Sequence, residues 1–279
     1  MPQISVIRTF VTASAFSLFQ AFGTAAFADI DKGLAALDTG DVATAASEFQ
    51  SSFQSGEGDG AFYLGRLFEF GLGTEADMSR AANLYAAGAE IGSVLAMNRL
   101  GLLYLEGTTL LRDYTEAARL FCNSADAGDQ TGQLNCALML KDGNGVAANA
   151  EEAVRYFDLA AQQGNIAAKN LLGQMLATGD GVPADADAAR ELFVQTALEG
   201  NAMGLFELAK SFLAEDDLVQ AYAYANLATV RQHTEARELR DRLEAQMSSD
   251  QINAGQEQAK VWTASRIAEQ AAAQQAQSE

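Results

Sequence analysis

The hydrophobic and small residues of this chain recur with a period of 36 residues. One glycine series and one alanine series show the period over five copies: Gly56, Gly92, Gly128, Gly164 and Gly200; Ala45, Ala81, Ala117, Ala153 and Ala189. A period of this length is typical of stacked copies of one small unit. Such an array offers surface to a partner more readily than it encloses a reaction.

The first half of each unit has the pattern of a helix that lies close to another helix. In one copy, Gly60 leads to the pair Leu64-Gly65 and then to Phe68. These offsets of three to four residues place one apolar face on a helix, and small residues on that face let a second helix approach.

Glycines then mark the end of this first helix. Gly71, Gly107, Gly143 and Gly179 open a loop, and a second glycine follows two positions later in three copies. Paired glycines suit a helix C-cap that needs a left-handed backbone. A phosphate-binding loop is the alternative, but no strand precedes the glycines and no Lys-Ser/Thr follows them. The pattern favours a repeated turn.

The second half of the unit predicts another amphipathic helix. Ala81, Leu84, Tyr85 and Ala89 lie on one helical face in one copy, and Gly92 ends it. Neither helix can bury its apolar face alone, so each hairpin must stack on its neighbour. The predicted fold class is therefore all-α, an α-solenoid of stacked antiparallel helix hairpins.

Two runs of sequence carry a family resemblance. LGRLFEFGLGTEADMSRAANLYAAGAEIG, from Leu64, and LLGQMLATGDGVPADADAARELFVQTALEGN, from Leu171, resemble Sel1-like repeats, which are related to tetratricopeptide repeats. The resemblance covers roughly residues 30–265. Departures are local: Thr109 replaces a loop glycine, Ala137 replaces the glycine of the Leu-Gly pair, and the last repeat is about four residues shorter. The resemblance implies an adaptor or regulatory protein that binds other proteins.

The N-terminus resembles a secretory signal peptide. Arg8 precedes an apolar stretch from Phe10 to Phe22, and the sequence Ala26-Phe27-Ala28 before Asp29 fits an A-x-A cleavage signal. A retained membrane anchor is the alternative, but the stretch is short and interrupted by polar residues. We expect cleavage between Ala28 and Asp29, no stable membrane insertion afterwards, and a periplasmic location.

The remaining chain divides into four segments. We expect N-terminal capping helices at 29–56, the repeat array at 57–233, C-terminal capping helices at 234–267 and a low-complexity tail at 268–279. Ser248 and Gln251 form a capping box, and the single tryptophan, Trp262, is expected to cover the last open face rather than to bind a ligand. The alanine- and glutamine-rich tail is expected to fray or to be disordered.

Charge excludes nucleic acid as a partner. The chain has 18 basic and 37 acidic residues, and residues 1–28 hold one of the basic residues and none of the acidic ones, so the mature part carries a net charge of −20. A strongly acidic surface repels phosphates. A basic or neutral protein surface is the better partner.

Acidic pairs raise the question of calcium, and they fit helix caps better. Glu151-Glu152, Asp185 with Asp187, and Glu215-Asp216-Asp217 fall in loops or at helix starts, where carboxylates accept amide hydrogen bonds. No twelve-residue loop with a distal glutamate is present. We expect no metal site and no cofactor.

Catalytic motifs are absent from the sequence. His233 is the single histidine, and there is no HExxH, GxSxG or CxxC motif. We expect an interaction protein that binds an envelope partner, such as the periplasmic region of a sensor kinase. The alternative is an enzyme, or an enzyme accessory, in envelope carbohydrate or peptidoglycan metabolism.

Cys122 and Cys136, the two cysteines, lie almost equally far from the expected turn near Gly128. They could form a disulfide in an oxidising compartment or remain two buried thiols, since Cys136 occupies the leucine position of its repeat. Cysteine-rich relatives of the Sel1-like family place disulfides across the same kind of hairpin, one turn nearer the loop.

Four leucines are not required by the repeat pattern: Leu102, Leu105, Leu111 and Leu138. Other copies carry residues such as Arg66, Glu69 or Gln174 at the corresponding helix positions. An apolar patch on first helices is a candidate partner surface, and burial within the stack is the alternative.

Overall fold

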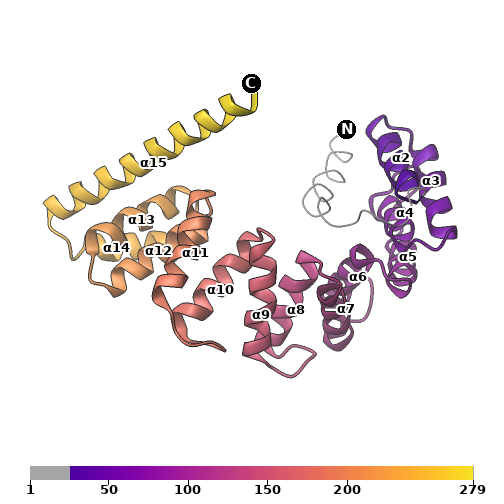
Figure 1. The fold of residues 1–279 in the computed structure, drawn as a ribbon, viewed down its shortest axis with the longest axis horizontal. Coiled ribbons are helices and arrows are strands. Elements are labelled where there is room, and N and C mark those ends of the chain that lie inside the picture. Colours follow the sequence, from indigo (N-terminus) through magenta and orange to yellow (C-terminus); the bar gives the residue numbers. More distant parts are fainter. Residues whose placement is uncertain (1–25, 279) are drawn as a thin grey trace. The chain divides into compact units, whose positions relative to one another are not determined.

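The protein is all-helical, as the sequence predicts. In a computed structural model that describes residues 26–278, fourteen α-helices and no strands are found (Figure 1). Their bounds are α2 Ala26–Asp38, α3 Val42–Gln54, α4 Gly58–Phe70, α5 Met78–Glu90, α6 Val94–Glu106, α7 Tyr114–Asp126, α8 Gln130–Asp142, α9 Ala150–Gln162, α10 Ile166–Thr178, α11 Ala186–Leu198, α12 Ala202–Ala214, α13 Leu218–Val230, α14 Thr234–Glu244 and α15 Ser249–Ser278.

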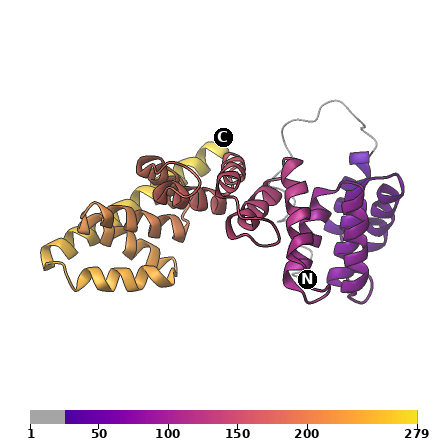
Figure 2. The same cartoon turned by 90° about the horizontal axis from the view of Figure 1, so that it is seen from below.

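The chain forms two compact units, one ending at Ala160 and one beginning at Ala161. Within each unit, most consecutive helices pack against each other as hairpins, α15 packs on α13, and Figure 2 shows the indigo and purple helices of the first unit in a row. First helices α4, α6, α8, α10 and α12 begin 36 residues apart, whereas α13 begins 32 residues after α11. The α-solenoid class and the shorter last repeat are confirmed.

Side-chain caps begin most of these helices. Asp77, Asp113 and Asp185 accept backbone N–H bonds at the starts of α5, α7 and α11, and Asp129 does the same for α8. Glu151 and Glu152 lie in the first turn of α9. The interpretation of acidic residues as caps is therefore confirmed for Asp185, whereas Glu151 and Glu152 lie in the first turn of a helix at whose start Asn149 accepts the backbone N–H bond.

Left-handed glycines end the first helices. Gly71, Gly107, Gly143 and Gly179 are C-caps with φ between 64° and 75°. A side chain would be strained in this conformation, which explains the glycine series. The prediction of a repeated turn is confirmed.

The glycine of the Leu-Gly pair makes room for an aromatic ring. A Cβ on Gly101 would lie 2.7 Å from the ring of Phe121, and one on Gly65 would lie 2.5 Å from the ring of Tyr85. Phe121 and Tyr85 are fully buried. The two helices of a hairpin thus approach closely around a ring, which fixes how each hairpin packs.

Both chain ends differ in part from the sequence-based divisions. Residues 1–25 of the expected signal segment lie outside the described residues, and α2 includes Ala28 and Asp29. At the other end, α15 continues through the low-complexity tail to Ser278, so the expectation of a disordered tail is wrong for the described residues. Alanine and glutamine are good helix formers and extend a helix that is already nucleated. No helix among residues 26–278 combines the length and apolar character needed to cross a bilayer.

Candidate protein-binding site

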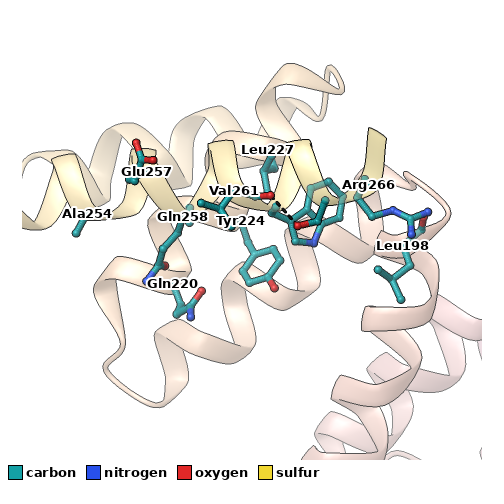
Figure 3. A pocket seen from close by; sticks show the side chains of 12 residues that line it. Leu198, Gln220, Tyr224, Leu227, Ala254, Glu257, Gln258, Val261 and Arg266 are labelled. Carbon is teal, nitrogen blue, oxygen red and sulfur yellow. Dashed lines mark hydrogen bonds between the residues drawn. The ribbon is translucent and has the colours of Figure 1, made fainter. Parts of the chain in front are cut away.

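A groove lies between α13 and α15 in the second unit (Figure 3). We call it the α13–α15 groove, and its volume is about 610 Å³. Tyr224, Leu227 and Val261 lie at its centre, with Leu198 and Arg266 at one end. Its complete lining is Leu198, Gln220, Ala223, Tyr224, Leu227, Ala254, Glu257, Gln258, Val261, Trp262, Ser265 and Arg266.

Three contacts hold α15 against the array. A Cβ on Gly255 would lie 2.7 Å from the ring of Tyr222, so glycine permits close approach at this crossing. The Tyr222 hydroxyl donates to Glu244 Oε1 at 2.7 Å and accepts from Gln256 Nε2 at 3.4 Å. Arg266 donates to the carbonyl oxygen of Leu198, the last residue of α11. The groove is thereby bounded by fixed elements.

The groove combines a packed floor with accessible walls. Tyr224, Leu227 and Trp262 are partly buried and pack against the core of the second unit. Burial raises the pKa of the Tyr224 hydroxyl, which therefore stays neutral. Val261 is 57% exposed and Leu198 38% exposed. Trp262 covers core residues, as expected, and also lines the groove, which the repeat pattern does not predict. The apolar positions on α13 and α15 were the available signal.

The leucines singled out in the sequence lie in the first unit. Leu102 and Leu105 on α6 and Leu138 on α8 are half-buried, so each has a packed side and an accessible side. Leu111, in the loop before α7, is 91% exposed. Burial of an exposed leucine of this kind by a partner would contribute favourably to the free energy of binding.

A charged cluster joins helices α4, α5 and α6. Glu69 accepts hydrogen bonds from Arg99 Nη2 at 2.6 Å, Arg66 Nη1 at 2.8 Å and the Tyr85 hydroxyl at 2.5 Å. Burial raises the pKa of the Glu69 carboxyl, but the hydrogen bonds from Arg99 and Tyr85 and the charge of Arg66 outweigh it and hold this pKa below its usual range. Burial and Glu69 also raise the pKa of Tyr85. An ionised, fully bonded glutamate is suited to cross-linking helices and not to proton transfer.

Cys122 and Cys136 are joined in the structure. The disulfide connects α7 to α8, with the two Cα atoms 4.8 Å apart, and Cys136 is fully buried. The bond thus links one repeat covalently to the next.

His233 has a structural environment. It precedes α14, where its Nδ1 accepts from the backbone N–H of Ala236 at 3.3 Å, and its ring stacks on Phe206. No group of three or more His, Cys, Asp or Glu side chains within residues 26–278 is arranged to hold a metal ion.

The fold and the repeated hairpins define the class of helical-repeat, solenoid proteins. Within that class, the Sel1 repeat model matches residues 58–93, 94–129, 131–165 and 166–201, just over half of the chain. The chain belongs to the Sel1 repeat family. Membership supports a role as a protein-interaction scaffold, because stacked repeats present extended surfaces to partners. No curated protein matches the sequence.

Solved structures show the same fold. A protective antigen, c5321, of uropathogenic Escherichia coli has an SLR fold; it is 21% identical, with a TM-score of 0.70 over 84% of this chain and 54% of that protein. This chain therefore spans about half the length of that antigen. A Sel1 repeat protein from Oxalobacter formigenes is 21% identical, with a TM-score of 0.68 over 74% of this chain and 87% of that one.

Proposed function

We propose that this protein is a periplasmic scaffold that binds an envelope protein through the surface of its repeats. The observation that carries the proposal is the repeat array itself: its patterned residues form caps, turns and helix contacts, and apolar side chains such as Leu111 remain exposed. The signal-like N-terminus supports the location. The excess of acidic residues favours a partner with a basic or neutral face, such as the periplasmic region of a sensor kinase.

Capture of the partner by crosslinking tests this function. The tagged chain is expressed in its own host and crosslinked, and the envelope fraction is purified. A stoichiometric envelope partner is the expected result. Localisation of the mature chain in the cytoplasm, or turnover of cell-wall fragments by the pure protein, would contradict the proposal and favour the enzyme alternative.

Substitution of leucines tests whether the first unit supplies the contact. Leu102→Ser with Leu138→Ser is expected to abolish capture while the melting temperature stays within a few degrees. Ile91→Ser is the matched control, because Ile91 is 46% exposed and lies outside the four-leucine set. A large fall in melting temperature would instead assign Leu102 and Leu138 to the core.

A further inference from the structure

We propose that the α13–α15 groove and the adjoining exposed face of α11 form a binding site for a partner segment in which apolar side chains are followed by lysines or arginines. This inference rests on the proposed scaffold function and names the kind of segment that the second unit binds. The site is separate from the four leucines of the first unit.

The groove supplies the apolar part of this site. Val261 on α15 and Leu198 at the end of α11 are exposed walls over a floor of Tyr224, Leu227 and Trp262. Exposed apolar side chains of the site and its surroundings are Val194, Leu198, Val261 and Ile267. A floor of partly buried aromatic and aliphatic side chains suits the anchor residues of a partner segment.

The face of α11 supplies the charged part. Asp187, Glu191, Val194 and Leu198 are spaced three or four residues apart and are all exposed, so they form one row on the helix surface. Leu198 lies in the groove wall, and the row leads away from it over about 17 Å. A segment that leaves the groove at Leu198 therefore passes Val194 and then two carboxylates.

These two carboxylates are available to a partner. Within the described residues, no ion pair or hydrogen bond is found for the side chains of Asp187 and Glu191. Arg190, on α11 itself, pairs with Glu215, while Arg266 and Arg231 donate to the carbonyl oxygens of Leu198 and Gly200 at the other end of the helix. The row thus keeps its negative charge, which complements lysine or arginine and repels an acidic segment.

A pair of peptides tests the site on the full mature chain. The probe has 16 residues, with tryptophan and two leucines at helical spacing in its first half and four lysines in its second half; the control peptide has glutamates in place of the lysines. Fluorescence anisotropy measures both affinities. The lysine peptide is expected to bind at least tenfold more tightly than the glutamate peptide.

Matched variants locate the binding. Val261→Ser is expected to weaken binding of the lysine peptide at least fivefold, and Val230→Ser, at a 74% exposed position outside the groove lining, by less than twofold. Asp187→Lys with Glu191→Lys is expected to weaken it at least fivefold, and Glu238→Lys, on the exposed surface of α14, by less than twofold.

Two results of the peptide experiment would overturn the site: no binding of either peptide at 1 mM, or equal binding of the two peptides. Two results of the variant experiment would also overturn it: equal effects of Val261→Ser and Val230→Ser, or equal effects of the α11 double substitution and Glu238→Lys. Self-association of the chain that Val261→Ser abolishes would assign the groove to a second copy and also overturn it. If any of these occurs while crosslinking still captures an envelope partner, the scaffold function stands and this site is wrong.

Discussion

At the scale of single residues, the contact between the second helix of one repeat and the first helix of the next involves two small side chains, but the smaller of the two lies on different helices in different repeats. Gly88 on α5 faces Ala96 on α6, where an added Cβ on the glycine would lie 3.0 Å from the alanine methyl group. Ser124 on α7 faces Gly132 on α8, the reverse arrangement. The total volume is conserved while the positions exchange, as expected for a close-packed junction.

This exchange predicts a rescue. Gly132→Ala is expected to lower the free energy of unfolding by about 1–3 kcal/mol, because the new Cβ would lie 2.5 Å from Ser124 Oγ. Adding Ser124→Gly recreates the Gly88–Ala96 arrangement and is expected to recover part of the loss. Urea unfolding of the wild type, both single variants and the double variant measures a coupling of about 1 kcal/mol or more. Strictly additive effects would show that the two side chains do not share this space.

The disulfide gives a second prediction at this scale. Labelling of the denatured, unreduced protein is expected to find no free thiol, and reduction is expected to lower the free energy of unfolding by about 3 kcal/mol, because the bond closes a short loop. A variant with Cys122→Ala and Cys136→Leu carries the residues of the preceding repeat, Ala86 and Leu100, and its stability should not respond to reductant. Two reactive thiols in the unreduced wild type would contradict the bond.

At the scale of helices, contacts between side chains far apart in sequence decide how the hairpins join. Glu69 on α4 bonds to Arg99 on α6 and to Tyr85 on α5, so one carboxylate links three helices. Asn170 on α10 similarly bonds to Asn201, the N-cap of α12, at 3.0 Å. These polar bonds add specificity to contacts between apolar faces, since a shifted register would leave them unpaired.

The Glu69 cluster predicts a pH dependence of stability. The folded-state pKa of Glu69 lies below the ordinary value of 4.5, so its stabilising contribution is present above that value and is lost as pH falls through the lowered folded pKa. Urea unfolding between pH 3 and pH 7 should show this loss in the wild type. Glu69→Gln should remove it.

Glu116 is the matched control for this pH series. Arg119 also lowers the pKa of Glu116, but that ion pair is more exposed and solvent screens it. Glu116→Gln should therefore change the pH dependence much less than Glu69→Gln. Similar effects of the two substitutions would show that Glu69 has no special role.

At the scale of the whole molecule, charge is the dominant property. Residues 29–279 carry a net charge of −20, and many cations already lie in local ion pairs, for example Arg80 with Asp77 and Arg155 with Glu152. The excess carboxylates generate a negative potential that reaches a partner before contact.

This potential predicts a kinetic effect of salt. Association with a basic partner is expected to slow as ionic strength rises, because salt screens long-range attraction, whereas dissociation should change less. Surface plasmon resonance with the captured partner, over a series of salt concentrations, measures both rates. An association rate that does not respond to salt would exclude steering by charge.

The amino-acid sequence by itself determined the repeat, the hairpins and the positions of turns. These features depend on interactions between residues close together in the sequence, such as the cap at Asp77 and the left-handed glycine at Gly71. Five copies of the unit show which positions recur. Even the role of acidic residues as caps follows from their place at helix starts.

The tertiary structure alone decided what lies outside the period. The fold-back of α15 onto α13, the groove between them and the contact of Arg266 with Leu198 depend on residues up to 68 positions apart that no repeat relates. The bond between Cys122 and Cys136, one of two arrangements that the sequence allowed, likewise required the distance between α7 and α8. Local sequence encodes hydrogen bonds and sterics along the chain, whereas contacts between distant helices depend on how their surfaces meet in three dimensions.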